Sequence, residues 1–180
     1  LEELGLLKMD FLGLRTLTVI QDTINLVKQN RGIDVEYDKD MSDPKVYKLW
    51  QDGDTVGIFQ FESQGITNFM KELKPDCLED IVAGVSLYRP GPMDQIPRYI
   101  ANKKDPEHAI YTHPALKPIL KVTYGCMVYQ EQVMQIVRDL AGYSLGRADL
   151  VRRAMGKKKL DVMAKEREYF IHGQTDENGN

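Results

Sequence analysis

Hydrophobic positions along the chain recur with mostly helical spacing, but one N-terminal stretch alternates instead. In residues 6–13, LLKMDFLG, apolar side chains at positions 7, 9 and 11 alternate with Lys8 and Asp10, which predicts a short strand. From position 14 the spacing changes to three or four residues, and Gly32 is a typical C-terminal stop. We therefore expect a strand followed by a helix in residues 1–33.

The rest of the chain predicts helices separated by short connectors. Ser42 or Asp43, followed by Pro44, is typical of a helix start, and further helices are expected at 66–73, 127–141, 147–156 and 160–173. An apolar helix before Arg89 must stop there because prolines follow at 90 and 92. The segment IFQF, 58–61, is compatible with a short strand or an extended approach. The predicted fold class is mainly α.

Composition restricts the function classes without choosing one. The 180 residues contain 42% hydrophobic and 28% charged residues, which fits a globular protein of one domain, or of one domain plus part of another. No apolar run is long enough for a membrane span, and no signal-peptide pattern is present. Cys77 and Cys126 lack metal-ligand spacing, so we expect neither a zinc site nor a disulfide framework. Two isolated cysteines are typical of a reducing compartment, so we expect a cytoplasmic location. Because the chain lacks an initiator Met and ends on QTDENGN, we expect a fragment of a longer protein.

A cationic cluster stands out because the net charge is only -3. In ADLVRRAMGKKK, residues 148–159, positions 150, 151, 154 and 155 are expected to form a buried stripe with Arg152 and Arg153 at its edges. Gly156 would allow close backbone approach to a ligand, and the next helix start offers free N–H groups. These features suit a polyphosphate, whereas the alternative is a solvated charged face; composition leaves both open.

Two other charged positions have equally open interpretations. Asp10 lies on a predicted strand, where carboxylates hold Mg²⁺ in nucleotidyl-transfer enzymes, but a single Asp cannot hold two ions. The alternatives are a salt bridge between Asp10 and Lys8, or a charge at the edge of a strand. The rigid turn YRPGPM, residues 88–93, either presents Arg89 to a phosphate or lets it bond backbone carbonyls.

Several long motifs resemble one family in the same order along the chain. KMDFLGLRTLTVI, GIFQFES, LKPDCLEDIVAGVSLYRPGPM, TYGCMVYQEQVMQI and LAGYSLGRADLVRRAMGKKK are similar to the bacterial replicative DNA polymerase III alpha subunit, the C-family polymerases. The resemblance implies a polymerase-beta-like palm and a helical fingers domain. Residues 1–33 would be the C-terminal part of the palm, and 34–180 the fingers, truncated at the C-terminal end.

The resemblance also implies roles for individual residues. Asp10 matches the third palm aspartate, a catalytic ligand of two Mg²⁺ ions, and Lys8 matches a basic position beside it. Lys158 and Lys159 are expected to be solvated charge. The implied substrates are primer-template DNA and a deoxynucleoside triphosphate (dNTP), and other holoenzyme subunits would bind outside this stretch. Basic residues would contact the triphosphate, and they are Arg152, Arg153, Lys157 and Arg89.

The missing aspartates predict that the isolated chain is inactive as a polymerase. The family's other two metal-binding aspartates lie in an Asp-x-Asp motif that in relatives stands before the segment matched here, and DGD at 52–54 is a turn in the fingers part. One carboxylate of three leaves neither ion properly held. The competing hypothesis is a helical nucleic-acid-binding or scaffold module that uses the basic cluster for phosphate-backbone contacts.

Overall fold

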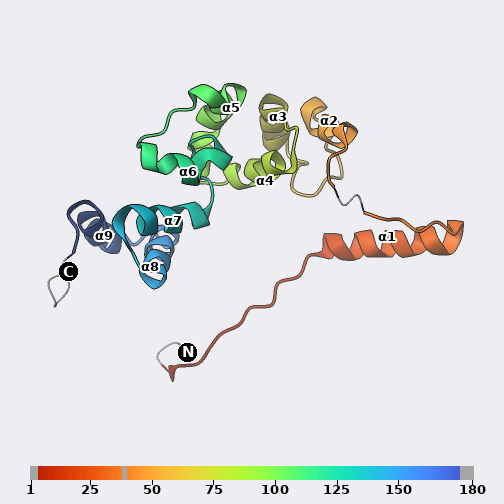
Figure 1. The fold of residues 1–180 in the computed structure, drawn as a ribbon. Helices are drawn as coiled ribbons and strands as arrows, with labels where there is room; N and C mark the ends of the chain where they lie inside the picture. Colours follow the sequence, from red (N-terminus) through yellow and green to blue (C-terminus); the bar gives the residue numbers. More distant parts are fainter. Residues whose placement is uncertain (1–3, 38–39, 175–180) are drawn as a thin grey trace.

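The structure is a computed structural model that describes residues 4–37 and 40–174, and nine α-helices lie within these ranges. Short 3-10 turns connect several of them, and the predicted mainly helical fold is confirmed (Figure 1). The helices are α1 (Arg15–Arg31), α2 (Pro44–Asp52), α3 (Gln64–Leu73), α4 (Leu78–Leu87), α5 (Ile96–Lys104), α6 (Lys117–Leu120), α7 (Gln130–Ala141), α8 (Leu145–Gly156) and α9 (Leu160–His172).

Local residue types explain where the first helices begin and end. α1 ends at Gly32, whose left-handed backbone (φ 65°) directs its N–H to the carbonyl of Lys28. The Asp43 carboxylate accepts a hydrogen bond of 2.8 Å from the Lys45 amide at the start of α2. Pro44 occupies the first turn, where its missing N–H costs no hydrogen bond. The predicted end of α1 and the predicted start of α2 are confirmed.

The predicted N-terminal strand is not formed. Residues 6–14 have no regular secondary structure, and no second strand occurs within the described ranges to supply ladder hydrogen bonds. Alternation alone therefore could not produce a strand here. The apolar side chains of this segment remain exposed, with Phe11 93% accessible, and α1 buries no residue. In Figure 1 this segment and α1 stand apart from the row of helices α2–α6.

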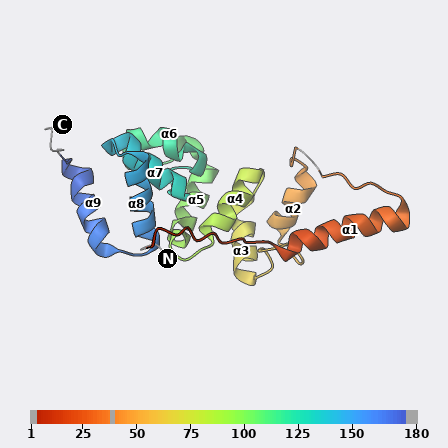
Figure 2. The same ribbon diagram turned by 90° about the horizontal axis from the view of Figure 1, so that it is seen from below.

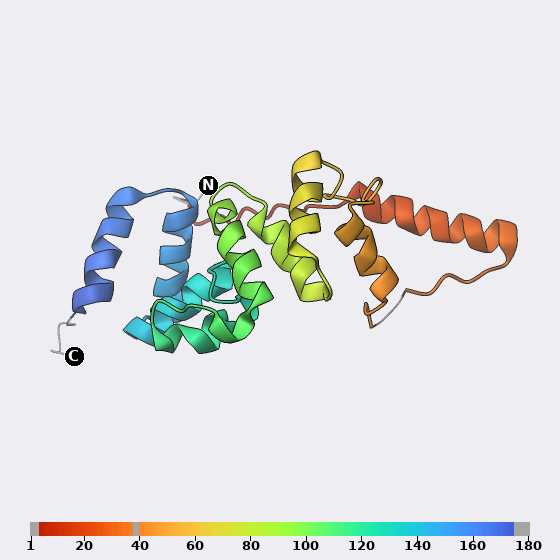
Figure 3. The same cartoon turned by 90° about the horizontal axis from the view of Figure 1, so that it is seen from above.

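A first hydrophobic core joins α3, α4 and α5 with the turns around them (Figure 3). Met70 and Leu87 are fully buried in it, and Tyr99 packs edge-on against Tyr124 with ring centroids 5.2 Å apart. Packing is close where α3 meets α4: a Cβ added to Gly84 would lie 2.8 Å from Met70 Sδ. The segment 58–61 contributes through turns instead of a strand or an extended approach.

A second, smaller core joins α7, α8 and α9, which lie together in Figure 2. Val137 of α7 packs here against Ala148 and Val151 of α8. Tyr143 donates a hydrogen bond of 3.1 Å to the carbonyl of Glu166 on α9. The Arg147 guanidinium lies over the Tyr143 ring, 4.4 Å from its centroid, and bonds the Glu166 carboxylate at 3.0 Å. These contacts fix α8 relative to α9.

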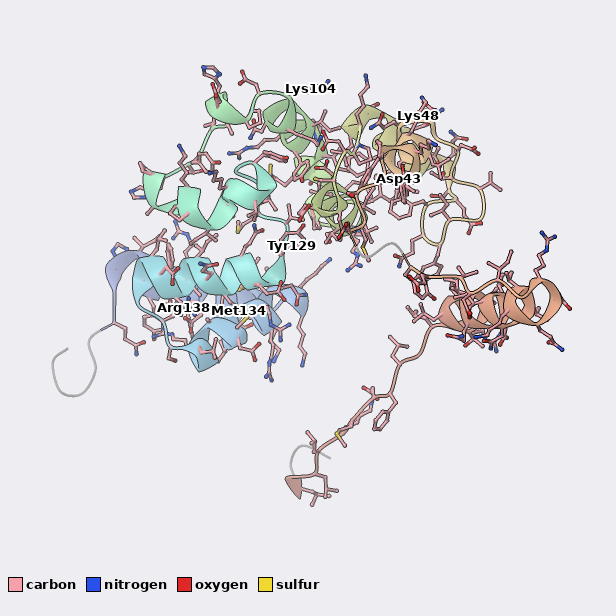
Figure 4. The ribbon with its side chains drawn as sticks, turned by 45° about the vertical axis from the view of Figure 1, so that its right-hand side comes forward. Asp43, Lys48, Lys104, Tyr129, Met134 and Arg138 are labelled. Carbon is pink, nitrogen blue, oxygen red and sulfur yellow. The ribbon has the colours of Figure 1, made fainter. Side chains whose placement is uncertain are left out.

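Buried Gln132 joins the two helical groups at the start of α7. Its Oε1 accepts hydrogen bonds from the backbone N–H of Val128 (2.8 Å) and of Tyr129 (2.9 Å). Its Nε2 donates to Thr123 Oγ1 at 2.8 Å. Figure 4 marks Tyr129 at this end of α7, with Arg138 near the other end. The Gln132 side chain thus satisfies two backbone amides before α7.

Candidate anion-binding site

Helix α8 carries the basic cluster and is fixed by a narrow buried row. The Ser144 hydroxyl accepts a hydrogen bond of 3.3 Å from the Arg147 amide at the helix start. The buried row consists of Ala148, Val151 and Ala154, spaced by three residues. The predicted stripe was therefore only half right, because the other two predicted members, at positions 150 and 155, flank this row and remain exposed.

Arg152 and Arg153, two of the arginines of α8, bind the same carboxylate. Asp149 Oδ1 accepts a hydrogen bond from Arg152 Nε at 2.8 Å, and Asp149 Oδ2 lies 2.5 Å from Arg153 Nη2. The spacing of three and four residues along the helix brings these side chains to one face. Hydrogen bonds from Arg152, the larger effect, and from Arg153 hold the pKa of Asp149 below its ordinary value.

The two arginines differ in their other contacts. Arg152 Nη1 also donates a hydrogen bond of 3.0 Å to Gln130 Oε1 on α7. The Arg152 side chain is half-buried, whereas that of Arg153 is 66% exposed. Arg152 therefore ties α8 to α7, and Arg153 is the arginine that extends toward solvent.

The connector between α8 and α9 places two lysines beside α8. The amide of Lys157 bonds the carbonyl of Arg153, and the amide of Lys159 bonds that of Ala154, each at 2.9 Å. Lys158 takes the left-handed backbone conformation (φ 52°), which reverses the chain direction between the helices. Gly156 belongs to the last turn of α8, and a Cβ there would meet no neighbour within 4 Å. The chain reversal therefore follows Gly156, which needs no special backbone freedom.

A cavity of about 530 Å³ opens between α8, this connector and the first turn of α9. Arg153, Lys157 and Lys159 supply its positive charge, and Asp149 supplies the negative charge. Leu150, Ala154 and Val162 form part of its apolar wall. Three cations around one hollow are suited to an anion carrying several charges.

The residues that line the cavity differ in two places from the triphosphate-binding residues expected around α8. Arg152 does not line it, whereas Lys159, expected to be solvated, does. Lys157, Lys158 and Lys159 are consecutive identical residues, so residue type alone does not indicate which of them line the cavity. Their different placement follows from the left-handed backbone at Lys158, which carries no sequence signal.

Arg89 lies on the other helical group, in the turn after α4, and its side chain is exposed. Its backbone shapes this turn, because its N–H bonds the carbonyl of Leu87 at 2.8 Å and its carbonyl accepts from the Met93 amide at 3.2 Å. Within the described part of the chain its guanidinium bonds no backbone carbonyl, and Arg89 does not line the cavity. The structure therefore does not bring Arg89 together with Arg153.

Lys8 and Asp10 form an ion pair, with Nζ 3.6 Å from Oδ1, in the exposed N-terminal segment. The described residues contain one group of three potential metal ligands, and it lies elsewhere: Asp76, Cys77 and Asp80. Lys103 already binds both carboxylates of that group, at 3.4 Å and 3.1 Å. Asp10 thus stands alone as a potential metal ligand in its segment, and the described residues do not fit a two-ion Mg²⁺ site.

Comparisons with known proteins agree with the helical architecture. The family model of the bacterial DNA polymerase III alpha subunit finger domain matches residues 16–178. DNA polymerase III subunit alpha of Staphylococcus aureus strain MRSA252 is 52% identical over 179 residues, which are 99% of this chain and 17% of the relative. The subunit of Thermus aquaticus is 53% identical over 178 residues, 96% of this chain and 15% of the relative.

The chain thus spans about one sixth of the length of these relatives. Every helix among the described residues is too short or too polar to cross a bilayer. The match to the family model extends over nearly all of the helical part of the structure, from within α1 to beyond the end of α9. The chain belongs to the bacterial DNA polymerase III alpha subunit finger domain family.

Proposed function

We propose that this chain is part of a bacterial replicative DNA polymerase and that its helices bind the incoming dNTP and cover the nascent base pair. Residues 34–180 act as fingers, and residues 1–33 belong to the edge of the palm. The parent enzyme adds nucleotides to the 3′-hydroxyl of a primer on template DNA. Other holoenzyme subunits bind to regions outside this chain.

The cavity beside α8 carries the proposal for the triphosphate. Arg153, Lys157 and Lys159 surround about 530 Å³ of space, and a triphosphate offers several charged oxygens to contact all three at once. Arg152 acts from outside the cavity by holding α8 against α7 through Gln130. Arg89 contacts the nucleotide only if the parent enzyme brings the turn after α4 toward α8.

Nucleotide binding to the 180-residue chain tests this proposal. We expect dATP to bind more tightly than dAMP, and Arg153→Ala to weaken dATP binding about tenfold, because a charge-assisted hydrogen bond is lost. Arg138→Ala is the matched control, since Arg138 lies near the end of α7, pairs with Asp139 and does not line the cavity. Equal weakening by both variants would contradict the proposal.

A phosphate-backbone binder would behave differently in the same experiment. Single-stranded DNA would then bind with a steep salt dependence, and removing either arginine would weaken it by similar amounts. dATP and dAMP would show no useful discrimination. That combination of results would favour the nucleic-acid-binding module over the dNTP site.

The metal site of the parent enzyme requires carboxylates that the described residues do not supply. We propose that Asp10 is one ligand of its Mg²⁺ ions, with Lys8 beside it, and that aspartates outside this chain complete the site. The isolated chain is then inactive, because positioned metal charge is the main means of catalysing phosphoryl transfer. Extension of a primer by the purified chain with Mg²⁺ and dNTPs would refute this.

A further inference from the structure

The Asp149 carboxylate holds two arginines that are anchored to different degrees. Arg152 has a second partner on α7, Gln130, at 3.0 Å. Arg153 pairs with Asp149 and extends its largely exposed side chain along the cavity. If Arg153 turned away, Arg152 would still hold Asp149 through its bond of 2.8 Å. One of the two contacts can therefore open while the other keeps the carboxylate in place.

We propose that Asp149 is an internal counter-anion that occupies Arg153 until the phosphate groups of a ligand displace it. This inference rests on the proposed function, since it concerns regulation of the same anion site. Arg153 exchanges one carboxylate for phosphate oxygens, and the contacts of Arg152 with Asp149 and with Gln130 stay in place. Asp149 is thus a positioning residue that sets how strongly the cavity attracts anions.

Exposure and charge make this exchange feasible. The Arg153–Asp149 pair lies at the surface, with 66% and 25% of the two side chains exposed, so solvent screens it and its opening costs little. Asp149 also lines the cavity and repels an entering anion. A ligand must therefore overcome both the pairing of Arg153 and the repulsion from the carboxylate. Both effects weaken binding, and both end when the carboxylate is neutralised.

Calorimetric titration of the 180-residue chain with inorganic tripolyphosphate tests the exchange. Asp149→Asn keeps the shape and a hydrogen-bond acceptor for Arg152 but removes the charge, so we expect binding about fivefold tighter. In the Arg153→Ala background the same change should tighten binding by less than about twofold, because no paired arginine remains to be released. Asp139→Asn is the matched control: it removes an arginine-paired carboxylate that does not line the cavity, and it should leave affinity unchanged.

The outcomes separate this inference from the proposed function. Absence of tripolyphosphate binding to the unsubstituted 180-residue chain would overturn both. If the unsubstituted chain binds and the affinity of Asp149→Asn is lower or equal, only the role of Asp149 is overturned. An equal gain with and without Arg153 would show simple repulsion and would also overturn the exchange. If circular dichroism shows that Asp149→Asn is not folded, Asp149→Ser replaces it under the same criteria.

Discussion

Replacing Lys103 by Met would leave a buried carboxylate without its main counter-ion. The Asp80 side chain is 1% exposed and that of Lys103 12%, and Lys103 Nζ lies 3.1 Å from Asp80 Oδ2. Lys103 also binds Asp76 at 3.4 Å and the carbonyl of Lys74 at 3.4 Å. Breaking a buried pair by removing one partner costs about 3–5 kcal/mol, because the remaining charge stays desolvated. That is a large part of a typical unfolding free energy of about 5–15 kcal/mol.

The loss should depend on pH in a defined direction. Burial raises the pKa of Asp80 above its ordinary value, despite the opposing backbone hydrogen bond at Asp76 and the charge of Lys103. A raised folded-state pKa means that the protonated carboxyl is favoured by folding, so stability falls as the pH rises through that pKa. In Lys103→Met this penalty is larger. The destabilisation is therefore greatest at neutral pH and shrinks as the pH falls and Asp80 is protonated.

Urea unfolding followed by circular dichroism measures this difference at pH 7 and at lower pH. The matched control is Lys48→Met, which breaks the exposed ion pair with Asp52 on α2 (Lys48 is marked in Figure 4) and should change stability by less than about 0.5 kcal/mol. The double variant Lys103→Met/Asp80→Leu should regain stability, because no buried charge remains. A loss below about 1 kcal/mol for Lys103→Met, or one that does not change with pH, would refute the reasoning.

Three further changes test the packing, the junction and the basic cluster. Gly84→Ala places a Cβ 2.8 Å from Met70 Sδ, and urea unfolding should show a loss of about 1–3 kcal/mol. Gln132→Leu removes the bonds to two backbone amides, and the same assay should show a loss of about 3 kcal/mol. The pKa of Asp149, followed by its carboxyl ¹³C chemical shift, should lie below the ordinary value, because hydrogen bonds from the arginines stabilise the ionised form. In Arg153→Ala this pKa should rise. The stability from this cluster is present above the ordinary pKa and is lost as the pH falls through the lowered one.

Matched changes on the same helices or residue types serve as controls. Gly146→Ala adds a Cβ with no neighbour within 4 Å, so it should not destabilise α8. Gln64→Leu removes an exposed glutamine whose amide bonds Asn68, and its cost should stay below about 1 kcal/mol. An unperturbed Asp149 titration, or equal losses for Gln64→Leu and Gln132→Leu, would contradict the corresponding predictions.

Local signals in the sequence predict several of the helix boundaries. Asp43 with Pro44 begins α2, and Gly32 and Gly142 end α1 and α7 with left-handed backbones. These signals work because they depend on backbone groups within a few residues. The prediction of an N-terminal strand was wrong for the opposite reason, since a strand needs hydrogen-bond partners from a distant segment.

The basic site was predictable in its residue types but not in its arrangement. Helical spacing indicated that Arg152 and Arg153 emerge together from α8, and both do contact Asp149. The two arginines differ because Arg152 also bonds Gln130, which precedes it by 22 residues and lies on another helix. No local pattern indicates this contact. The placement of Lys159 depends on one backbone torsion in the connector. Tertiary contacts and single torsions are the features that spacing along a chain does not encode.

The two hydrophobic cores have a consequence for how the chain folds. The first core uses residues between positions 50 and 128, and the second uses residues between 134 and 169, so each core is built from one continuous part of the chain. Contacts confined to one part of the chain need shorter closing loops than contacts across its whole length, which favours faster folding. The two groups meet at the start of α7, so each is able to open while the other keeps its amide protons protected from exchange. A fingers part built this way would begin to assemble while the remainder of a long polypeptide is still being synthesised.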